Sequence, residues 1–496
     1  MGCEPDQWAK DWLAEQRAKG QTGLTVEKRG ESHIVKWATT KWNPETKKRR
    51  KISEYRGVLH PDGTLAEPRP QRDRAEVVQI LDSGNARLLA RCTEPLIPAL
   101  KSSFPEDYPE IVELAFARIL GRGELNKVGR CWNRLENVLG LRPNTSPKSL
   151  SATLERVGLS RVKQDLYFSS ISQDEHRMAV DMSVFFSRSK GAMMVRTGYN
   201  RFRLSCPQFN LVVSCGLASG RPQYMKVVPG NLKEGCMVTM LDEFDIDEGT
   251  ILVMDRGYFD RKLMSEIRGK GLDYLVAVKR NSKVYDKVQV TDSMFRWRDS
   301  AVKFGVSRIS DDEWAYRFEN LNHRNDELVD TLRAQELGRR RDLKLDKAGN
   351  FIMVSSREMD PREAYSLYKS RCAVEDLFDT AKNILSADKM HMHDDAHVMG
   401  HLFITFIAAQ IRFELSRLID EADLSSRYSP EDVLDIYSVM KVLTSDTGVR
   451  QVVPKDLRDL DARLKVFMYS TPEDLDKLNG IRKKRGRKPK ASEPSS

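Results

Sequence analysis

The sequence lacks paired cysteines, and this absence excludes two common ways of stabilising a small protein. Its seven cysteines are an odd number and include no Cys-x-x-Cys pair. Neither a zinc site nor a disulfide framework is therefore expected. With 496 residues, of which 40% are hydrophobic, the chain is long enough for about two to four domains with hydrophobic cores of their own.

The sequence also lacks a hydrophobic run that would cross a membrane. Its longest apolar stretch, VMGHLFITFIAAQI (398–411), is shorter than the roughly 20 residues that a membrane helix needs, and it contains His401. We expect a buried core helix there. The opening MGCEPDQWAK is polar and carries no charged-then-apolar leader, so we expect no secretion, no membrane partner and a cytoplasmic, nucleoid-associated protein.

Positive charge is concentrated at the end of the chain. The net charge is +10, and residues 481–496 hold seven Lys or Arg against one Glu, which leaves +4 for the rest. Such a tail cannot bury apolar surface and is expected to be disordered. Its RGRKP core resembles an AT-hook, in which Arg485 and Arg487 would enter a narrow A·T minor groove. Nonspecific phosphate binding by a basic tail is the alternative.

Two aspartates occupy places where strands are expected. In HRMAVDMSVFFSRS, strict alternation puts Asp181 and Ser183 on one face of a strand and apolar side chains on the other. A buried, unpaired Asp is costly, so a cation or hydrogen-bonding partner should lie nearby. In GTILVMDRGYFDRKL, the strand 251–254 ends at Asp255, where open α/β sheets bind ligands. A structural salt bridge for Asp181 and a helix cap for Asp255 remain alternatives.

The segment YSLYKSRCAVEDLFDTAKNIL predicts a helix with a polar stripe. Counted from Tyr368, the residues Arg371, Glu375 and Lys382 follow at offsets of 3, 7 and 14, which fall within an arc of about 60° on a helix. An apolar stripe beside it would pack on a core; it comprises Leu367, Val374, Phe378, Ala381 and Leu385. An ordinary solvated helix face with intrahelical ion pairs is the alternative.

Together these segments offer three carboxylates, Asp181, Asp255 and Glu375. Oxygen-only ligands suit Mg²⁺ or Mn²⁺. Two such ions, held roughly 4 Å apart by Asp181, Asp255 and Glu375, would activate a water or a 3′-hydroxyl and stabilise the leaving oxygen of a phosphodiester. The neighbouring Arg371 and Lys382 would hold phosphates of the same substrate.

The chain resembles DDE transposases of the insertion-sequence type, in the cut-and-paste branch marked by a Tyr-Arg-Glu-Lys signature, the insertion sequence four and sixteen-thirty-four groups. The resemblance rests on Asp181 in VDMS, Asp255 in DRGY and the four signature residues, with support from VVPGNLKEG and GHLFITFIA, and it covers about residues 30 to 425. It implies an RNase H-like core in which the two Asp and the Glu bind the metals. It also implies that Tyr368, Arg371 and Lys382 contact the cleaved transposon end.

The N-terminal part reads as two regions. The segments 31–40 and 51–59 predict strands joined by a turn at Asn43 and Pro44, next to the basic run 47–51. With Trp37 and Trp42, this run could grip a DNA backbone or form a solvated basic loop. From about 75 to 165 we predict helices, including 76–84, 109–120 and 133–140, which could present a recognition helix to DNA.

The fold class expected from these patterns is α/β, an RNase H-like core interrupted by an insertion, with an N-terminal β-hairpin and helical DNA-binding regions. Core strands are expected near 176–187, 208–218, 223–229, 251–254, 273–279 and 351–356, and a helix over 396–420. In the insertion, 282–290 and 313–320 suggest strands and the second half looks helical. Trp297 or Trp314 could stack on a flipped base, although core packing is the commoner use of Trp.

Seven domains or segments are predicted along the chain. They are a β arm (1–65), a helical DNA-binding region (66–165), the first half of the RNase H-like core (166–284), the insertion (285–349), the second half of the core (350–425), a C-terminal helical region (426–480) and the basic tail (481–496).

The sequence therefore predicts a transposase that binds terminal inverted repeats, cleaves DNA with metal ions and joins the ends to target DNA. Its partners would be double-stranded DNA, both transposon ends and target, and a second copy of the chain, because synapsis brings two ends together. Two alternatives stay open: a structure-selective DNA endonuclease, and a non-catalytic DNA-binding regulator derived from a transposase.

Overall fold

The computed structural model divides the chain into two compact units, which are described separately. One comprises Met1–Val77 with Ser445–Thr447, and the other comprises Val78–Thr444 with Gly448–Ser496. The tail 481–496, with Arg485 and Arg487, lies outside the described residues. The structure describes residues 4–43, 48–66, 77–172, 176–187, 189–200, 204–232, 241, 243, 246–338, 347–385, 392–445 and 448–466.

The N-terminal unit packs one helix, α1 (Gln7–Ala18), on an antiparallel sheet of order β1-β2-β3-β4. The strands are β1 (Leu24–Arg29), β2 (Ser32–Asn43), β3 (Lys48–Leu59) and β4 (Leu65–Ala66). Its small core consists of Ala9, Leu24, Val35 and Leu59, with Trp8, Trp12, Leu13, Val26 and Trp37 packed around them. The two strands predicted at 31–40 and 51–59 are present, and the hairpin is longer than expected.

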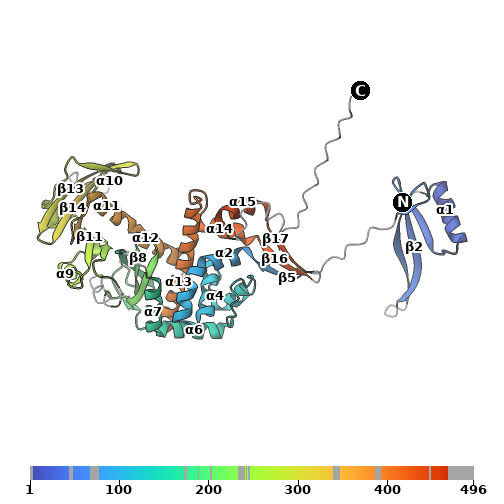
Figure 1. Cartoon of the computed structure of the whole chain (residues 1–496), viewed down its shortest axis with the longest axis horizontal. Helices are drawn as coiled ribbons and strands as arrows, with labels where there is room; N and C mark the ends of the chain where they lie inside the picture. Colours follow the sequence, from blue (N-terminus) through green and yellow to red (C-terminus); the bar gives the residue numbers. More distant parts are fainter. Residues whose placement is uncertain are drawn as a thin grey trace, which may run out of the picture. The chain divides into compact units, whose positions relative to one another are not determined.

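The larger unit is built on a ten-stranded sheet with the order β12-β13-β14-β15-β11-β10-β6-β8-β7, in which β9 also pairs with β8. Figure 1 labels β8, β11, β13 and β14 of this sheet. Strand β10 runs parallel to β6 and β11, whereas β8 and β15 run antiparallel to their neighbours. The protein is thus of mixed α/β class, as predicted. The strands are β6 (Arg177–Phe186), β7 (Arg196–Thr197), β8 (Pro207–Gly216), β9 (Pro222–Pro229), β10 (Ile251–Met254), β11 (Asp273–Val278), β12 (Met294–Trp297), β13 (Ser300–Ser310), β14 (Glu313–Asn320) and β15 (Asn350–Ser355).

Helices cover the central strands on both faces, because alternate residues of a buried strand point to opposite sides. In β10, Ile251 and Val253 belong to a core shared with helix α11 (Pro361–Ser370), whereas Leu252 and Met254 belong to the main core with helix α9 (Arg261–Gly269). The four-residue apolar run of β10 is therefore buried on both sides, as its sequence suggests.

The helix predicted over 109–120 is present as α4. The helices predicted over 76–84 and 133–140 are wrong. Residues 77–82 form strand β5 (Val77–Asp82) instead of a helix, because they pair with a strand near the C-terminus, and 133–140 form turns. The helices are α2 (Gly84–Thr93), α3 (Ile97–Ser103), α4 (Tyr108–Ile119), α5 (Leu125–Trp132), α6 (Pro147–Leu159) and α7 (Arg161–Ile171).

The insertion and the C-terminal region each depart from one prediction. Residues 282–290 contain only a 3₁₀ turn, η4 (Lys283–Asp286), whereas β14 and helix α10 (Leu321–Glu336) agree with the sequence. The region after 426, predicted as helical, also contains strands β16 (Lys441–Ser445) and β17 (Gly448–Val452), which join β5 in a sheet of order β17-β16-β5. Its helices are α14 (Pro430–Ser438) and α15 (Lys455–Leu464).

Helix α13 (Asp395–Glu421) is the long apolar helix that the sequence predicts at 396–420, and it is buried along most of its length. In the described residues of the chain, no helix is both long enough and apolar enough to span a membrane. The helix crosses α6 where Gly158 and Gly400 meet. A Cβ at Gly158 would lie 1.8 Å from the carbonyl oxygen of Ala396, and one at Gly400 would lie 2.0 Å from that of Leu154. The crossing is therefore close enough to require glycine on both helices.

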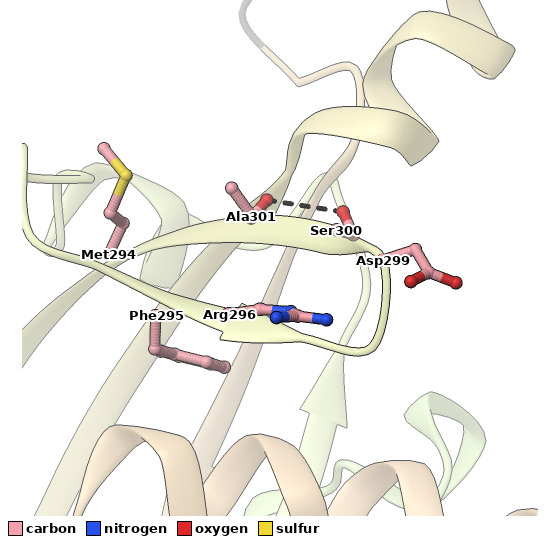
Figure 2. Close-up of a pocket in the computed structure, with 6 residues that line it drawn as sticks. All are labelled: Met294, Phe295, Arg296, Asp299, Ser300 and Ala301. Carbon is pink, nitrogen blue, oxygen red and sulfur yellow. Dashed lines mark hydrogen bonds between the residues drawn. The ribbon is translucent and has the colours of Figure 1, made fainter.

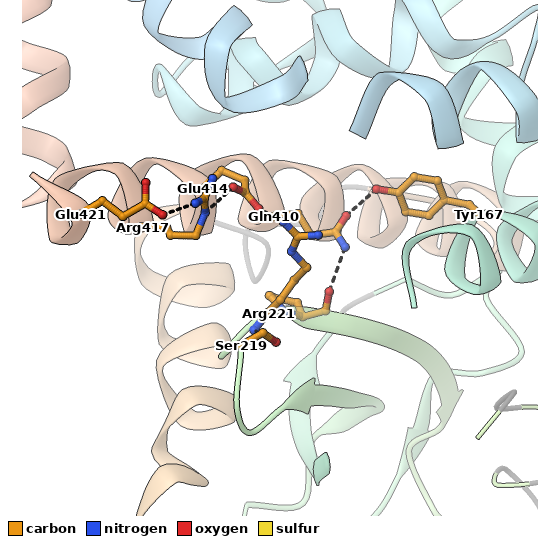
Figure 3. A network of polar contacts seen from close by, with 8 residues as sticks. Tyr167, Ser219, Arg221, Gln410, Glu414, Arg417 and Glu421 are labelled. Atoms are coloured by element: carbon orange, nitrogen blue, oxygen red, sulfur yellow. Dashed lines mark hydrogen bonds and ion pairs between the residues drawn. The ribbon is translucent and has the colours of Figure 1, made fainter. Parts of the chain in front are cut away.

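A polar network ties the other end of α13 to the sheet (Figure 3). Gln410 accepts a hydrogen bond from the Tyr167 hydroxyl (2.6 Å) and donates one to the carbonyl of Pro222 at the start of β9 (2.9 Å). Glu414, with a side chain 2% exposed, forms ion pairs with Arg221 and with Arg417. The network thus compensates a fully buried carboxylate with two guanidinium groups.

We expect Glu414→Gln to lower the free energy of unfolding by about 2 kcal/mol, because it leaves the largely buried Arg221 without its counter-charge. Chemical denaturation with urea measures this change. Glu421→Gln is the matched control, since Glu421 pairs with the same Arg417 but is 57% exposed, and we expect a change close to zero. Equal effects of the two substitutions would contradict the assignment of the buried pair as the stabilising one.

Candidate active site

Two aspartates lie side by side on neighbouring parallel strands. Asp181 lies in the middle of β6, and Asp255 directly follows β10. The register pairs Ile251 with Arg177 and Val253 with Ala179, so its continuation brings Asp255 level with Asp181. Adjacent strands are about 4.8 Å apart, which places the two carboxylates at the same end of the sheet.

Asp181 is largely buried and strongly influenced by its neighbours. Its carboxylate accepts hydrogen bonds from the backbone N–H of Met182 (2.8 Å) and the Tyr258 hydroxyl (3.4 Å), and it pairs with Arg371 (3.1 Å). Burial raises the pKa of Asp181 to about 6, and the negative charges of Asp255 and Glu375 contribute to the rise. The three carboxylates are therefore close enough to repel one another.

The segment with the polar stripe is helical but not one continuous helix, which corrects the prediction. Tyr368 lies on α11, Arg371 at the junction with α12 (Cys372–Asp379), Glu375 on α12, and Lys382 in a π-helical turn, η5 (Thr380–Ile384). The apolar stripe faces the core as predicted, since its five side chains are buried. A π-helical turn holds one extra residue, and such turns often occur at functional sites.

Arg371 joins two of the carboxylates. Its guanidinium lies 3.1 Å from Asp181 Oδ2 and 2.5 Å from Glu375 Oε1, and its side chain is only 12% exposed. Burial opposes its charge, but Asp255, Asp181 and Glu375 outweigh this effect and raise the pKa of Arg371 further. The Nε atom of Arg371 is buried without a hydrogen-bond partner. The positive charge inside this acidic site is thus supplied by the protein itself.

Tyr368 forms a hydrogen bond with the third carboxylate, that of Asp255. Its hydroxyl donates a hydrogen bond to Asp255 Oδ1 (3.2 Å), and its ring lies 5.7 Å from the ring of Phe351. Burial raises the pKa of Tyr368, and the charge of Asp255 adds to the effect. The phenol is therefore a hydrogen-bond donor throughout the physiological pH range.

Lys382 contacts the face of β6 that carries Asp181, two residues further along the strand at Ser183. Its ammonium group donates a hydrogen bond to Ser183 Oγ (2.6 Å) and lies 4.7 Å from the centre of the Phe185 ring. Alternation puts Asp181, Ser183 and Phe185 on one side of β6, so Arg371 and Lys382 meet successive residues of that side. All six predicted residues, three carboxylates and three partners, thus belong to one connected site.

The site has the ligand chemistry of a divalent-metal centre but not its geometry. Within the described residues, no three His, Cys, Asp or Glu side chains lie together closely enough to hold a metal ion. The carboxylate oxygens suit Mg²⁺ or Mn²⁺. They are, however, bound by Arg371 and Tyr368, so a cation would have to replace at least the contacts of Arg371 to reach Asp181 and Glu375.

Two residues of the site were not predicted from the sequence. Tyr258, almost fully buried in the 3₁₀ turn η3 (Arg256–Tyr258), donates to Asp181, and Ser183 accepts from Lys382. Tyr258 is the last residue of the DRGY motif, so its position directly after the second aspartate was the available signal. Ser183 lies on the strand face predicted for Asp181, and its alternation with Asp181 was the available signal.

The insertion carries a pocket of about 600 Å³, apart from these residues (Figure 2). It lies on the β12–β13 hairpin and is lined by Met294, Phe295, Arg296, Asp299, Ser300 and Ala301. Trp297, from the same hairpin, packs edge-to-face on Tyr365 at 5.4 Å, and Trp314 lies beneath Arg308 at 5.5 Å. Both tryptophans are partly buried and pack against the core that includes Tyr316 and Phe318, and base stacking by either stays a prediction.

Comparison with known proteins finds a family whose matched region contains all six of these residues. Residues 177–411 match a family model described as "Transposase DDE domain". No curated protein sequence matches the chain. Among solved structures, the chain is similar to a piggyBac transposase in a cryo-electron microscopy structure of its synaptic complex with hairpin DNA. The identity is 12% and the TM-score 0.36, and the match covers 71% of this chain and 70% of that chain.

Proposed function

We propose that the chain, whose residues 177–411 match a transposase DDE domain, catalyses cut-and-paste transposition of DNA. In this proposal it binds the terminal inverted repeats of its element, hydrolyses phosphodiester bonds at the ends and transfers the freed 3′-hydroxyls to target DNA. The observation that carries the proposal is that Asp181 and Glu375 bind the same guanidinium, that of Arg371, while Asp255 lies on the strand next to Asp181 and accepts a hydrogen bond from Tyr368. We interpret the sheet that holds the two aspartates as an RNase H-like core.

Asp181, Asp255 and Glu375 would hold two Mg²⁺ or Mn²⁺ ions. Bound ions of this kind activate a water or 3′-hydroxyl and stabilise the leaving oxygen of a phosphodiester. The rigid strands fix the two aspartates, whereas Glu375 is 56% exposed and tethered by an ion pair. Glu375 is therefore the ligand with the freedom to adjust when DNA and metal arrive.

Arg371, Tyr368 and Lys382 would act on the DNA end. Once Arg371 leaves the carboxylates, its planar guanidinium can bind a phosphate through two hydrogen bonds. Lys382 is held beside the carboxylates by Ser183 and could contact a second phosphate. Tyr368, which remains protonated, can donate its hydrogen bond to a phosphate oxygen as well as to Asp255. The same side chains thus neutralise the site at rest and the substrate during reaction.

Three further features belong to the proposal. The tail with Arg485 and Arg487 would add A·T-rich minor-groove or phosphate contacts. Two copies of the chain would form a homodimer, because two transposon ends must be held together. The protein would work in the cytoplasm on the nucleoid.

Metal removal tests the proposed chemistry. With duplex DNA that contains the sequences flanking the coding region, we expect strand cleavage in Mg²⁺ or Mn²⁺ and none after chelation with EDTA, because the carboxylates alone cannot activate the nucleophile. Products are resolved on denaturing gels. Binding of the same duplex, measured by gel shift, should persist in EDTA and serves as the control.

A second assay with precut ends separates the proposal from its alternatives. A transposase joins 3′-hydroxyl ends to a target plasmid, whereas a structure-selective endonuclease cuts but never joins. A DNA-binding regulator shows neither reaction in any metal. Cleavage without joining, or binding without cleavage, would therefore replace the proposed function with one of these two.

A further inference from the structure

The N-terminal unit has one sheet face that nothing within the described residues of the unit covers. Leu24, Val35 and Leu59 are buried toward helix α1, where the ring of Trp8 lies 4.5 Å from that of His33. The alternate residues of the strands point to the other side. We call this side the open face; it carries Lys36, Thr40, Trp42, Arg49, Ser53 and Tyr55.

The register places polar and aromatic side chains opposite one another on the open face. Trp42 pairs with Arg49 across the β2–β3 ribbon, and Lys36 pairs with Tyr55. Lys36 also forms an ion pair with Glu27 of β1 (2.6 Å), which fixes the face to which it points. Trp42 is 56% exposed and Tyr55 45% exposed, and neither belongs to the core of the unit. A partner that binds the open face would therefore bury the rings of Trp42 and Tyr55.

Charge identifies the class of this partner. The described residues of the ribbon, 34–43 and 48–59, contain seven Lys or Arg and one Glu, whereas residues 4–19, which include α1, contain three Lys or Arg and four Asp or Glu. The positive charge of the unit is therefore concentrated on the ribbon. A polyanion that approaches the ribbon gains from this asymmetry through the release of its counterions.

Shape favours a duplex among polyanions. The ribbon runs beyond the end of α1 (Figure 1). Its eight residues from Lys36 to Asn43 span about 26 Å at 3.3 Å per residue, and the major groove of DNA, about 12 Å wide and 8.5 Å deep, admits a two-stranded ribbon. The distal end of the ribbon could therefore enter the groove while α1 stays outside.

We propose that the N-terminal unit is a DNA-binding module of its own, in which the β2–β3 ribbon lies in the major groove with its open face toward the bases. Trp42 contacts bases or sugars, and Arg49 contacts phosphate. The inference rests on the proposed function, which makes duplex DNA the substrate, and it adds a second DNA contact outside residues 177–411.

The test uses the full-length protein in EDTA, where cleavage does not interfere, with a 40-base-pair duplex of mixed sequence. Trp42→Ala should weaken binding about five- to hundredfold, as expected for loss of one aromatic contact with a base. Arg49→Gln should lower the slope of log affinity against log salt by about 1, since one phosphate contact is lost. Fluorescence anisotropy over a range of KCl concentrations measures both effects.

Lys10→Gln on α1 is the matched control, because it removes one positive charge from the same unit on the side away from the open face, and it should change neither quantity. Protection of guanine N7 from dimethyl sulfate is the second readout. Wild type and Lys10→Gln should protect N7 atoms in the major groove, and Trp42→Ala should not. Unchanged thermal unfolding of the variants will show that they are folded, as expected for exposed side chains.

Wild-type affinity and N7 protection in both ribbon variants would overturn the inference, and so would tighter binding of single-stranded DNA or RNA than of the duplex. Its failure is separate from failure of the proposed function. If the ribbon variants bind normally while metal-dependent cleavage and joining occur, only the inference falls. If the ribbon binds duplex DNA and no cleavage or joining occurs in any metal, only the proposed chemistry falls.

Discussion

Asp181→Asn is expected to abolish DNA cleavage and, in the absence of metal, to stabilise the fold. The neutral amide cannot replace a carboxylate as a ligand of Mg²⁺, so we expect the cleavage rate to fall on the order of a thousandfold or more. Denaturing gels with end-labelled duplex measure this loss. Gel shifts should show that DNA binding is retained.

The expected gain in stability follows from the burial of Asp181. A folded-state pKa of about 6, above the ordinary 3.8, means that the ionised carboxylate is less stable in the folded than in the unfolded protein. This penalty is fully present above pH 6 and disappears below about pH 4. A shift of two units corresponds to about 3 kcal/mol, and after relaxation of the site we expect about 1–2 kcal/mol of stabilisation at pH 7.

Glu375→Gln is the control that separates the two effects. It also removes a carboxylate of the site, so cleavage should stop, but its side chain is 56% exposed and carries no comparable burial penalty. We expect its unfolding in urea with EDTA to match wild type within about 0.5 kcal/mol. A cleavage rate near wild type for either variant would remove the basis for the proposed metal site.

Gly400→Ala is expected to cause the largest loss of stability. The new methyl group would lie 2.0 Å from the carbonyl oxygen of Leu154, and both helices would have to separate to relieve the contact. Overpacking in a core commonly costs about 1–3 kcal/mol, and a collision with backbone has no flexible side chain to absorb it. We therefore expect a loss of about 4 kcal/mol or more.

Gly269→Ala provides the matched comparison. Gly269 is also helical, at the end of α9, but nothing lies within 4 Å of the position that a Cβ would take there. Alanine at this position should leave stability unchanged or raise it by up to about 1 kcal/mol, since glycine is the poorer helix former. Urea denaturation of the two variants side by side measures the difference. Similar stabilities would show that the crossing of α6 and α13 tolerates a wider spacing than we infer.

The residues of the site were predictable because each belongs to a short local pattern. Alternation around Asp181, the apolar run before Asp255 and the helical spacing of Tyr368, Arg371 and Glu375 all depend on neighbours in the sequence. The structure places these three patterns against one another through a parallel strand pair and one helix–strand contact. Local periodicity therefore pointed to the residues, whereas their proposed roles came from the resemblance to DDE transposases.

What the sequence did not predict depends on distant contacts. The break at Arg371 and the π-helical turn at Lys382 follow from how α12 fits over β6, and helical spacing alone does not contain this information. Strand β5 was mistaken for a helix because its partner β16 lies more than 350 residues later in the chain, as about 360 positions separate Val77 from Lys441. Tertiary pairing in this case outweighs local propensity.

The position of Arg371 affects how the protein folds and how it would bind metal. The guanidinium of Arg371 already compensates the negative charges of Asp181 and Glu375. The site can therefore fold without a bound metal ion, even where free magnesium is scarce. A metal ion bound as proposed would have to displace this guanidinium, so its affinity would depend on competition with Arg371 as well as on the carboxylate oxygens. Under the proposed function, metal would therefore bind more readily when a DNA phosphate is present to bind the displaced Arg371 side chain.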